Sequence, residues 1–148
     1  MTTAVATRGA VAFDIPGGLI DVSSIHYLAN DASAFHRASF GSPPNRDVVA
    51  AARHAHESGK TVLVMTGGDK RLEQLVAAWL VRSGVPATLM RCRGDYRPGA
   101  AVKRERLRAA HRQFDSLTVC SADPSVTRLS EQEGIDVMPL PGYWGATQ

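Results

Sequence analysis

A carboxylate follows the first apolar run of this chain and opens a glycine-rich turn. Asp14 comes directly after the run Gly9 to Phe13 and precedes Pro16-Gly17-Gly18. Small and apolar residues bounded by turn signals predict a buried strand, which places Asp14 at the carboxyl end of that strand. In open α/β sheets, ligands bind beyond the carboxyl ends of the strands, so this acid would face whatever the protein binds. The structural alternative is an aspartate that caps a helix or closes a turn.

Polar side chains also follow three later apolar runs. They are Thr66, Arg91 and the turn Ser121-Ala122-Asp123. Parallel strands bring their carboxyl ends to one edge of a sheet, so we expect these groups to face the same crevice as Asp14. Lys103, near the start of a basic helical stretch, can reach that crevice too.

The elements that would position these groups alternate along the chain. We expect strands at 9–13, 61–66, 87–90, 117–120 and 135–138, and helices at 32–38, 45–58, 69–83, 100–114 and 124–133. This alternation predicts an α/β fold, a doubly wound parallel sheet between two layers of helices. We expect residues 1–148 to form one such domain.

Three features of the predicted elements carry further expectations, of which the first concerns the crevice. Residues 21–44 form a long connection with one short helix, and connections of this length are often lids or binding loops. Its size indicates that no large cap domain covers the crevice, and an open crevice suits a macromolecular partner. Trp79 lies on the apolar stripe of the helix at 69–83, which favours a core position over a role in stacking on a ligand. Asn45 is expected to cap the next helix.

The composition limits the classes of protein that the chain can represent. It has 148 residues, of which 44% are hydrophobic and 21% charged, as in globular domains. No apolar run approaches the ~20 residues that span a membrane, and residues 1–8 lack the pattern of a secretory signal, so we expect a cytoplasmic protein without a membrane partner. Cys92 and Cys120 lie far apart without metal-ligand spacing, which indicates reduced, buried thiols.

The order of these motifs resembles the haloacid dehalogenase (HAD) superfamily, and within it the 3′-phosphatase domain of phage-type polynucleotide kinase-phosphatases. The resemblance covers nearly the whole chain. The residues that carry it are Ala34-Phe35-His36, Pro43-Pro44-Asn45, Val64-Met65-Thr66-Gly67, Trp79-Leu80, Gly84-Val85-Pro86, Gly94-Asp95-Tyr96-Arg97-Pro98, Val102-Lys103 and Asp123-Pro124. The kinase half has no counterpart, because the sequence contains no Gly-x-x-x-x-Gly-Lys-Ser/Thr loop.

The resemblance implies a HAD-like Rossmannoid fold and a role for each matching residue. Asp14 corresponds to the nucleophile that forms an aspartyl-phosphate. Thr66 would hydrogen-bond the phosphoryl group, and Lys103 would balance the charge of that group and of Asp14. Mg2+ would be held by Asp14, with Asp123 as a further ligand.

The sequence departs from the family pattern at the positions that carry the chemistry. The second, acid/base Asp is replaced by Pro16, a Thr by Gly18, an Arg by Gly68, an Asp by Gly99, and the Asp pair that holds Mg2+ by Ser121-Ala122. Because the affinity for hard cations follows the number of carboxylates, we expect Mg2+ binding to be weak or lost. The helix patterns and core residues show no comparable loss.

We therefore predict a catalytically degenerate pseudophosphatase that needs no cofactor and acts as a binding or regulatory module for a protein or a nucleic-acid end. One alternative is a weak or atypical polynucleotide 3′-phosphatase-like hydrolase that uses Asp14 and Mg2+.

A second alternative is nucleic-acid binding without chemistry, through the basic region that begins with Arg91, Arg93 and Arg97. Against it, the helix that follows has no interleaved aromatic residues. In that case Arg104, Arg108 and Arg112 form a solvated helix face whose charge Glu105 partly offsets.

Overall fold

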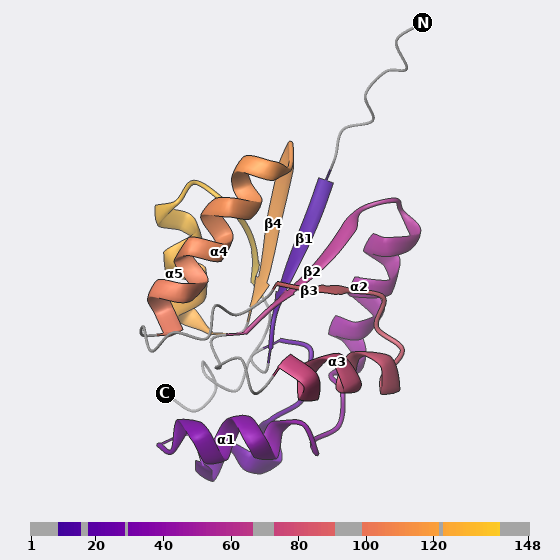
Figure 1. The fold of residues 1–148 in the computed structure, drawn as a ribbon, viewed down its shortest axis with the longest axis vertical. Helices are drawn as coiled ribbons and strands as arrows, with labels where there is room; N and C mark the ends of the chain where they lie inside the picture. The colour runs from indigo at the N-terminus through magenta and orange to yellow at the C-terminus, as the bar shows by residue number, and fades with distance from the viewer. Residues whose placement is uncertain are drawn as a thin grey trace, which may run out of the picture.

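A parallel sheet forms the centre of the protein. A computed structural model describes residues 9–15, 18–28, 30–66, 73–90, 99–121 and 123–139. Within these ranges five strands pair in parallel in the order β3-β2-β1-β4-β5 (Figure 1). They are β1 Gly9–Asp14, β2 Thr61–Met65, β3 Thr88–Leu89, β4 Ser116–Ser121 and β5 Asp136–Pro139. The predicted doubly wound parallel sheet is confirmed.

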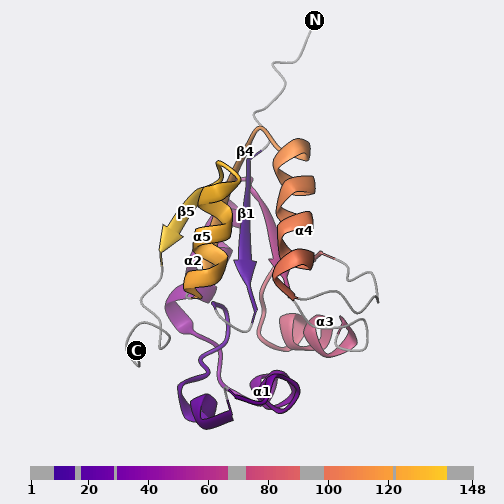
Figure 2. The same ribbon diagram turned by 90° about the vertical axis from the view of Figure 1, so that its left-hand side faces the viewer.

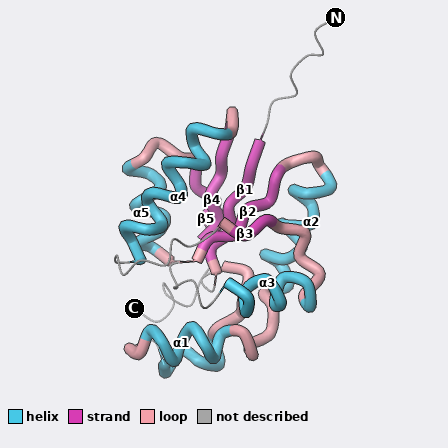
Figure 3. The backbone as a smooth tube through the Cα atoms, in the orientation of Figure 1, coloured by secondary structure: helices cyan, strands magenta, loops and turns pink. Residues whose placement is uncertain are grey.

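Helices cover both faces of this sheet. On one face lie α2 (Arg46–Glu57) and α3 (Glu73–Arg82), and on the other α4 (Gly99–Gln113) and α5 (Pro124–Gln132). Figure 2 shows α4 and α5 side by side on the same face, and Figure 3 shows the strands between the two layers of helices. The arrangement is the expected three-layer fold.

The strand residues alternate between two cores. Val11 and Phe13 belong to the cluster with α2 and α3, whereas Ala10 and Ala12 belong to the cluster with α4 and α5. Burial of both faces explains why the strands are continuous apolar runs. Trp79 is 1% exposed within the first cluster, so its predicted core position is confirmed.

The long connection after β1 lies beyond the carboxyl edge of the sheet (Figures 1 and 2). It contains a 3-10 helix, η1 (Ser23–Leu28), and the helix α1 (Ala32–Ser39), which matches the predicted short helix. A bridge between Ile20 and Pro44 closes its base. Within the described ranges this connection adds no separate cap domain.

Two predictions about local structure need correction. The strand expected at 87–90 is observed as Thr88–Leu89, and the Met90 N–H donates one further hydrogen bond to the Val64 carbonyl at 2.8 Å. Asn45 precedes α2, but its side chain makes no cap hydrogen bond. Its backbone N–H instead donates to the Leu19 carbonyl at 2.8 Å, which ties the start of α2 to the turn after β1.

Other predictions fall partly outside the described residues. Cys120 is buried as expected, whereas Cys92 and the tail with Tyr143 and Trp144 lie outside the described ranges. The described part of the helix predicted at 69–83 begins at Glu73. No helix among the described residues is long and apolar enough to cross a membrane.

Candidate functional site

Asp14 ends the central strand of the sheet, where the chemistry was expected. The neighbouring strands are β2, in which Met65 pairs with Asp14, and β4, in which Cys120 pairs with Phe13. The polar residue that follows each of these positions, Thr66 or Ser121, therefore lies beside the end of β1. Asp14, Thr66 and Ser121 are 1%, 3% and 1% exposed, so the end of the sheet buries three polar side chains.

The Asp14 carboxylate has a partner for each of its oxygens. The ammonium of Lys103, on α4, lies 2.9 Å from Oδ1. The hydroxyl of Ser121, on β4, donates to Oδ2 at 2.9 Å. The Lys103 contact is an ion pair without the geometry of a directed hydrogen bond, so Oδ1 accepts no hydrogen bond from the described residues.

Burial makes these partners energetically important. The Lys103 side chain is 14% exposed and the Asp14 side chain 1%, so water screens their attraction only weakly. A buried carboxylate is costly unless it is paired and hydrogen-bonded. Lys103 supplies the opposite charge and Ser121 the hydrogen bond, so the Asp14, Lys103 and Ser121 side chains form one self-compensating cluster, here called the Asp14 cluster.

Sequence reasoning treated Ser121 only as a lost carboxylate and missed its role as a donor. Its hydroxyl donates to Asp14 and also accepts a hydrogen bond from the Asp123 backbone N–H at 3.0 Å. No local signal predicts the first contact, because it joins residues 107 positions apart. Ser121 thus connects the start of α5 to the end of β1.

Asp123 lies beside this cluster, but one of its carboxylate oxygens caps a helix. Oδ1 accepts hydrogen bonds from the backbone N–H and the hydroxyl of Ser125, at 2.9 and 2.8 Å. The Asp-Pro-Ser sequence at the start of α5 carries the signal for this cap, an N-cap acid followed by a proline in the first turn. A role for Asp123 as a metal ligand stays a prediction.

The turn after β1 is closed around Gly18. A Cβ added at Gly18 would lie 2.8 Å from the backbone oxygen of Asp14, which accepts a hydrogen bond from the Leu19 N–H at 3.3 Å. The threonine of the family pattern therefore does not fit this turn without a shift of the backbone. Pro16, Gly68 and Ala122 lie outside the described residues, and Gly99 begins α4.

The weak or lost Mg2+ binding expected from the sequence stays a prediction, and the described residues of the Asp14 cluster bear on it through their number of carboxylates. This ion takes oxygen ligands in octahedral geometry, of which one or two are protein carboxylates. Asp14 is the one carboxylate of the cluster, and the Lys103 ammonium already balances its charge. Among the described residues, no group of three His, Cys, Asp or Glu side chains could hold a metal ion.

The basic helix α4 is partly neutralised within the protein. Arg108 donates to both carboxylate oxygens of Glu133, and Arg104 donates to the side-chain oxygen of Gln132 at 2.9 Å. The hydrogen bond from Arg108 lowers the pKa of Glu133 and raises that of Arg108. Glu133 therefore offsets part of the charge that could have contacted phosphates. Arg91, Arg93 and Arg97 lie outside the described residues.

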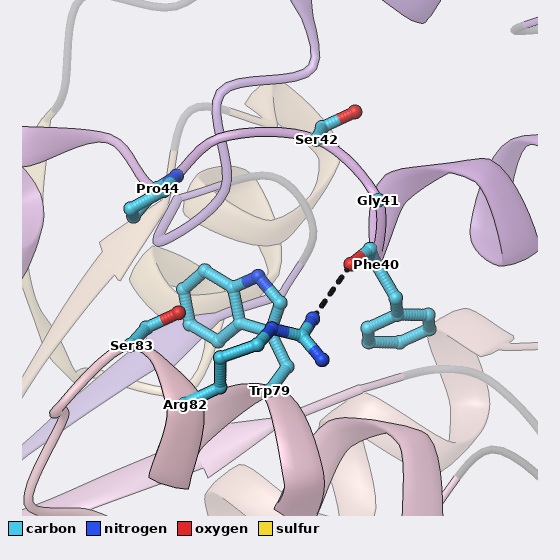
Figure 4. A pocket seen from close by; sticks show the side chains of 7 residues that line it. All are labelled: Phe40, Gly41, Ser42, Pro44, Trp79, Arg82 and Ser83. Atoms are coloured by element: carbon cyan, nitrogen blue, oxygen red, sulfur yellow. Dashed lines mark hydrogen bonds between the residues drawn. The ribbon is translucent and has the colours of Figure 1, made fainter.

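A cavity of about 610 Å3 lies between α3 and the segment before α2 (Figure 4). Trp79 and Phe40 contribute buried rings to its lining. The Arg82 guanidinium, which also lines the cavity, donates a hydrogen bond to the Phe40 carbonyl at 2.9 Å. None of the site residues expected from the sequence lines this cavity.

Solved structures resemble this chain in fold. A chain of the Pnkp1/Rnl/Hen1 complex matches with a TM-score of 0.72 and 16% identity, over 95% of this chain and 48% of its own length. A chain of the Pnkp1/Rnl/Hen1 RNA repair complex matches with a TM-score of 0.71 and 17% identity, over 95% of this chain and 44% of its own length. This chain thus spans about half the length of the chains that it matches.

No protein-family model and no curated protein matches the sequence. At 16% and 17% identity, the likeness to solved structures shows the fold alone.

Proposed function

We propose that this protein is a catalytically degenerate relative of the polynucleotide 3′-phosphatases and acts as a binding module for a macromolecular partner. The observation that carries the proposal is the hydrogen bond that the Ser121 hydroxyl donates to Oδ2 of Asp14, at the position where the family pattern has a metal-binding carboxylate. A carboxylate nucleophile must present an oxygen to phosphorus, and a metal-dependent one must also share an oxygen with the ion. In this cluster, Oδ2 accepts a hydrogen bond from Ser121, whereas the pairing of Oδ1 with Lys103 is one that the family pattern also expects.

The residues around Asp14 support the same proposal. Pro16 can neither donate nor accept a proton, so the general acid of the family pattern has no replacement at that position. Ser121 is neutral where the pattern has a metal-binding carboxylate, and Gly18 fills a turn that leaves no room for a side chain. Loss of a general acid or of a charge-stabilising group typically costs ~10^2-fold or more in rate. Together these losses favour binding over turnover.

A protein partner is favoured over a nucleic-acid end. The solved structures of similar fold are chains of multi-protein complexes, which by analogy suggests an assembly role for this fold. Arg104 and Arg108 contact residues at the end of α5 and are less available to phosphates. Tyr27, in the connection beyond the carboxyl edge, is 79% exposed, as an aromatic residue of an interface would be.

The test is hydrolysis of p-nitrophenyl phosphate and of a 3′-phosphorylated oligonucleotide, each with and without Mg2+. We expect the wild-type protein and Asp14→Asn to give the same background rate. Far-ultraviolet circular dichroism of both proteins serves as the control for folding. Mg2+-dependent turnover that Asp14→Asn abolishes would overturn the proposal and support the alternative, a weak phosphoester hydrolase.

A further inference from the structure

A second cavity lies at the β3 edge of the sheet, lined by residues outside the Asp14 cluster. Its volume is about 430 Å3, and it lies between α4 and the strands β2 and β3. Its apolar walls include Leu63, Leu89, Ala110 and Phe114. β3 is the edge strand, so no described strand continues the sheet beyond it. We call this cavity the edge groove.

One cation lines the edge groove. Arg106 is partly buried there, and no described residue forms a hydrogen bond or an ion pair with it. Its neighbours Arg104 and Arg108 both contact the end of α5. Residues two apart on a helix point in nearly opposite directions, so Arg106 lies on the other side of α4 from these two pairs.

No described residue supplies Arg106 with a negatively charged partner in the groove. Partial burial removes some of its water, and the other polar residues that line the groove, Thr61, Thr88 and Gln113, are neutral. The volume is in the range of small-molecule sites, which combine apolar walls with a few polar groups that orient the ligand. We propose that the edge groove binds a small organic acid, whose apolar body lies against Leu89 and Phe114 and whose carboxylate pairs with Arg106.

The structural alternative is that the Arg106 stem only covers apolar surface while its head stays in water. In that case the groove would bind apolar molecules without regard to their charge. A matched pair of probes separates the two explanations. 4-Phenylbutyrate carries the carboxylate, and 4-phenylbutanamide has the same apolar body without the charge.

The experiment titrates both probes into the full chain and follows amide chemical shifts by NMR. We expect saturable binding of 4-phenylbutyrate with shifts at β3 and α4, and at least tenfold weaker binding of the amide, because a charge-assisted hydrogen bond is lost. Arg106→Gln should weaken binding of the acid about tenfold and leave the amide unchanged. Arg112→Gln, an exposed arginine on the same helix, is the matched control and should change neither.

A second variant tests the groove itself. Ala109 is exposed at the groove, so Ala109→Leu adds apolar volume there with little risk to the fold, and it should weaken both probes. Three outcomes would each overturn the proposal. They are equal affinity for the acid and the amide, equal effects of the Arg106 and Arg112 variants, and no saturable binding. The Asp14 cluster plays no part in this test, so its outcome is independent of the proposed function.

Discussion

The ammonium of Lys103 lies 2.9 Å from Oδ1 of Asp14 and ties α4 to the central strand. The family pattern also brings these two residues together, because its lysine would balance the charge of both the nucleophile and the phosphoryl group. In this protein they compensate one another in a largely buried place, so their contribution to stability becomes the first quantity to measure.

Removal of the Lys103 charge should destabilise the protein. Lys103→Met leaves the Asp14 carboxylate buried without its counter-charge, and breaking a buried pair in this way costs on the order of 3 kcal/mol. Urea unfolding measures the change. Asp14→Asn combined with Lys103→Met should recover part of the loss, because the unpaired charge is then gone. Lys60→Met, at an exposed lysine, is the control. A Lys103→Met protein as stable as this control would contradict the buried ion pair.

A carboxylate restored at position 121 should make stability depend on Mg2+. Ser121→Asp removes the donor to Asp14 Oδ2 and places a second negative charge beside it, so the free energy of unfolding should fall in the presence of a chelator. Millimolar Mg2+ should restore part of the lost free energy of unfolding, because an ion that binds only the folded state stabilises that state. Thermal unfolding with and without Mg2+ measures the effect.

Two proteins serve as controls for this Mg2+ effect. The wild type and Ser121→Ala should show the same melting temperature in Mg2+ and in chelator, since neither adds a ligand. A wild-type protein that Mg2+ stabilises as much as Ser121→Asp would show that the present residues already hold the ion.

A side chain at position 18 should strain the turn after β1. Gly18→Ala brings a Cβ within 2.8 Å of the Asp14 carbonyl oxygen, a backbone atom that cannot move alone. We expect a loss of about 1–3 kcal/mol, as for other overpacked sites. Gly41→Ala is the matched control, because its Cβ would lie 3.6 Å from the nearest atom, the Ala38 carbonyl oxygen. Equal stability of the two variants would show that the turn can open at little cost.

The buried Cys120 thiol should make the free energy of unfolding fall at alkaline pH. Burial raises the pKa of Cys120 to about 11, whereas an exposed thiol has a pKa of about 8.5. Between these values the folded chain keeps a proton that the unfolded chain has lost. The free energy of unfolding should therefore decrease as the pH rises through this window. Urea unfolding at a series of pH values measures the slope, which Cys120→Ala should reduce.

The same thiol can be checked by its reaction rate in a Cys92→Ser background. The thiolate is the reactive form, so a disulfide reagent at about pH 8 should react with Cys120 much more slowly in native protein than in urea. Equal rates in both conditions would show that Cys120 is accessible in the folded state.

The fold could be predicted because its signals are local. Apolar runs bounded by glycines predicted the strands, and because both faces of the sheet are buried, these runs are continuous. The position of Asp14 at the carboxyl end of β1 followed from the same pattern. The strand expected at 87–90 is Thr88–Leu89 in the structure, because the local pattern does not set where its pairing with β2 begins and ends.

The site could be predicted only in outline. The sequence indicated that Lys103 could reach Asp14, but the donor role of Ser121 depends on the register of β4 beside β1, which no single segment encodes. The closure of the turn at Gly18 likewise depends on a backbone oxygen in the preceding strand. The cap formed by Asp123 is different, because its Asp-Pro-Ser signal was visible in the sequence.

The hydrogen bonds around Ser121 give the protein a built-in spectroscopic reporter. The backbone N–H of Asp123 donates to the Ser121 hydroxyl, which in turn donates to Asp14. Protonation or substitution of Asp14, or a ligand bound to its carboxylate, would change the strength of these two linked hydrogen bonds. The amide resonance of Asp123 would then shift, so one backbone signal at the start of α5 reads out events at the end of β1.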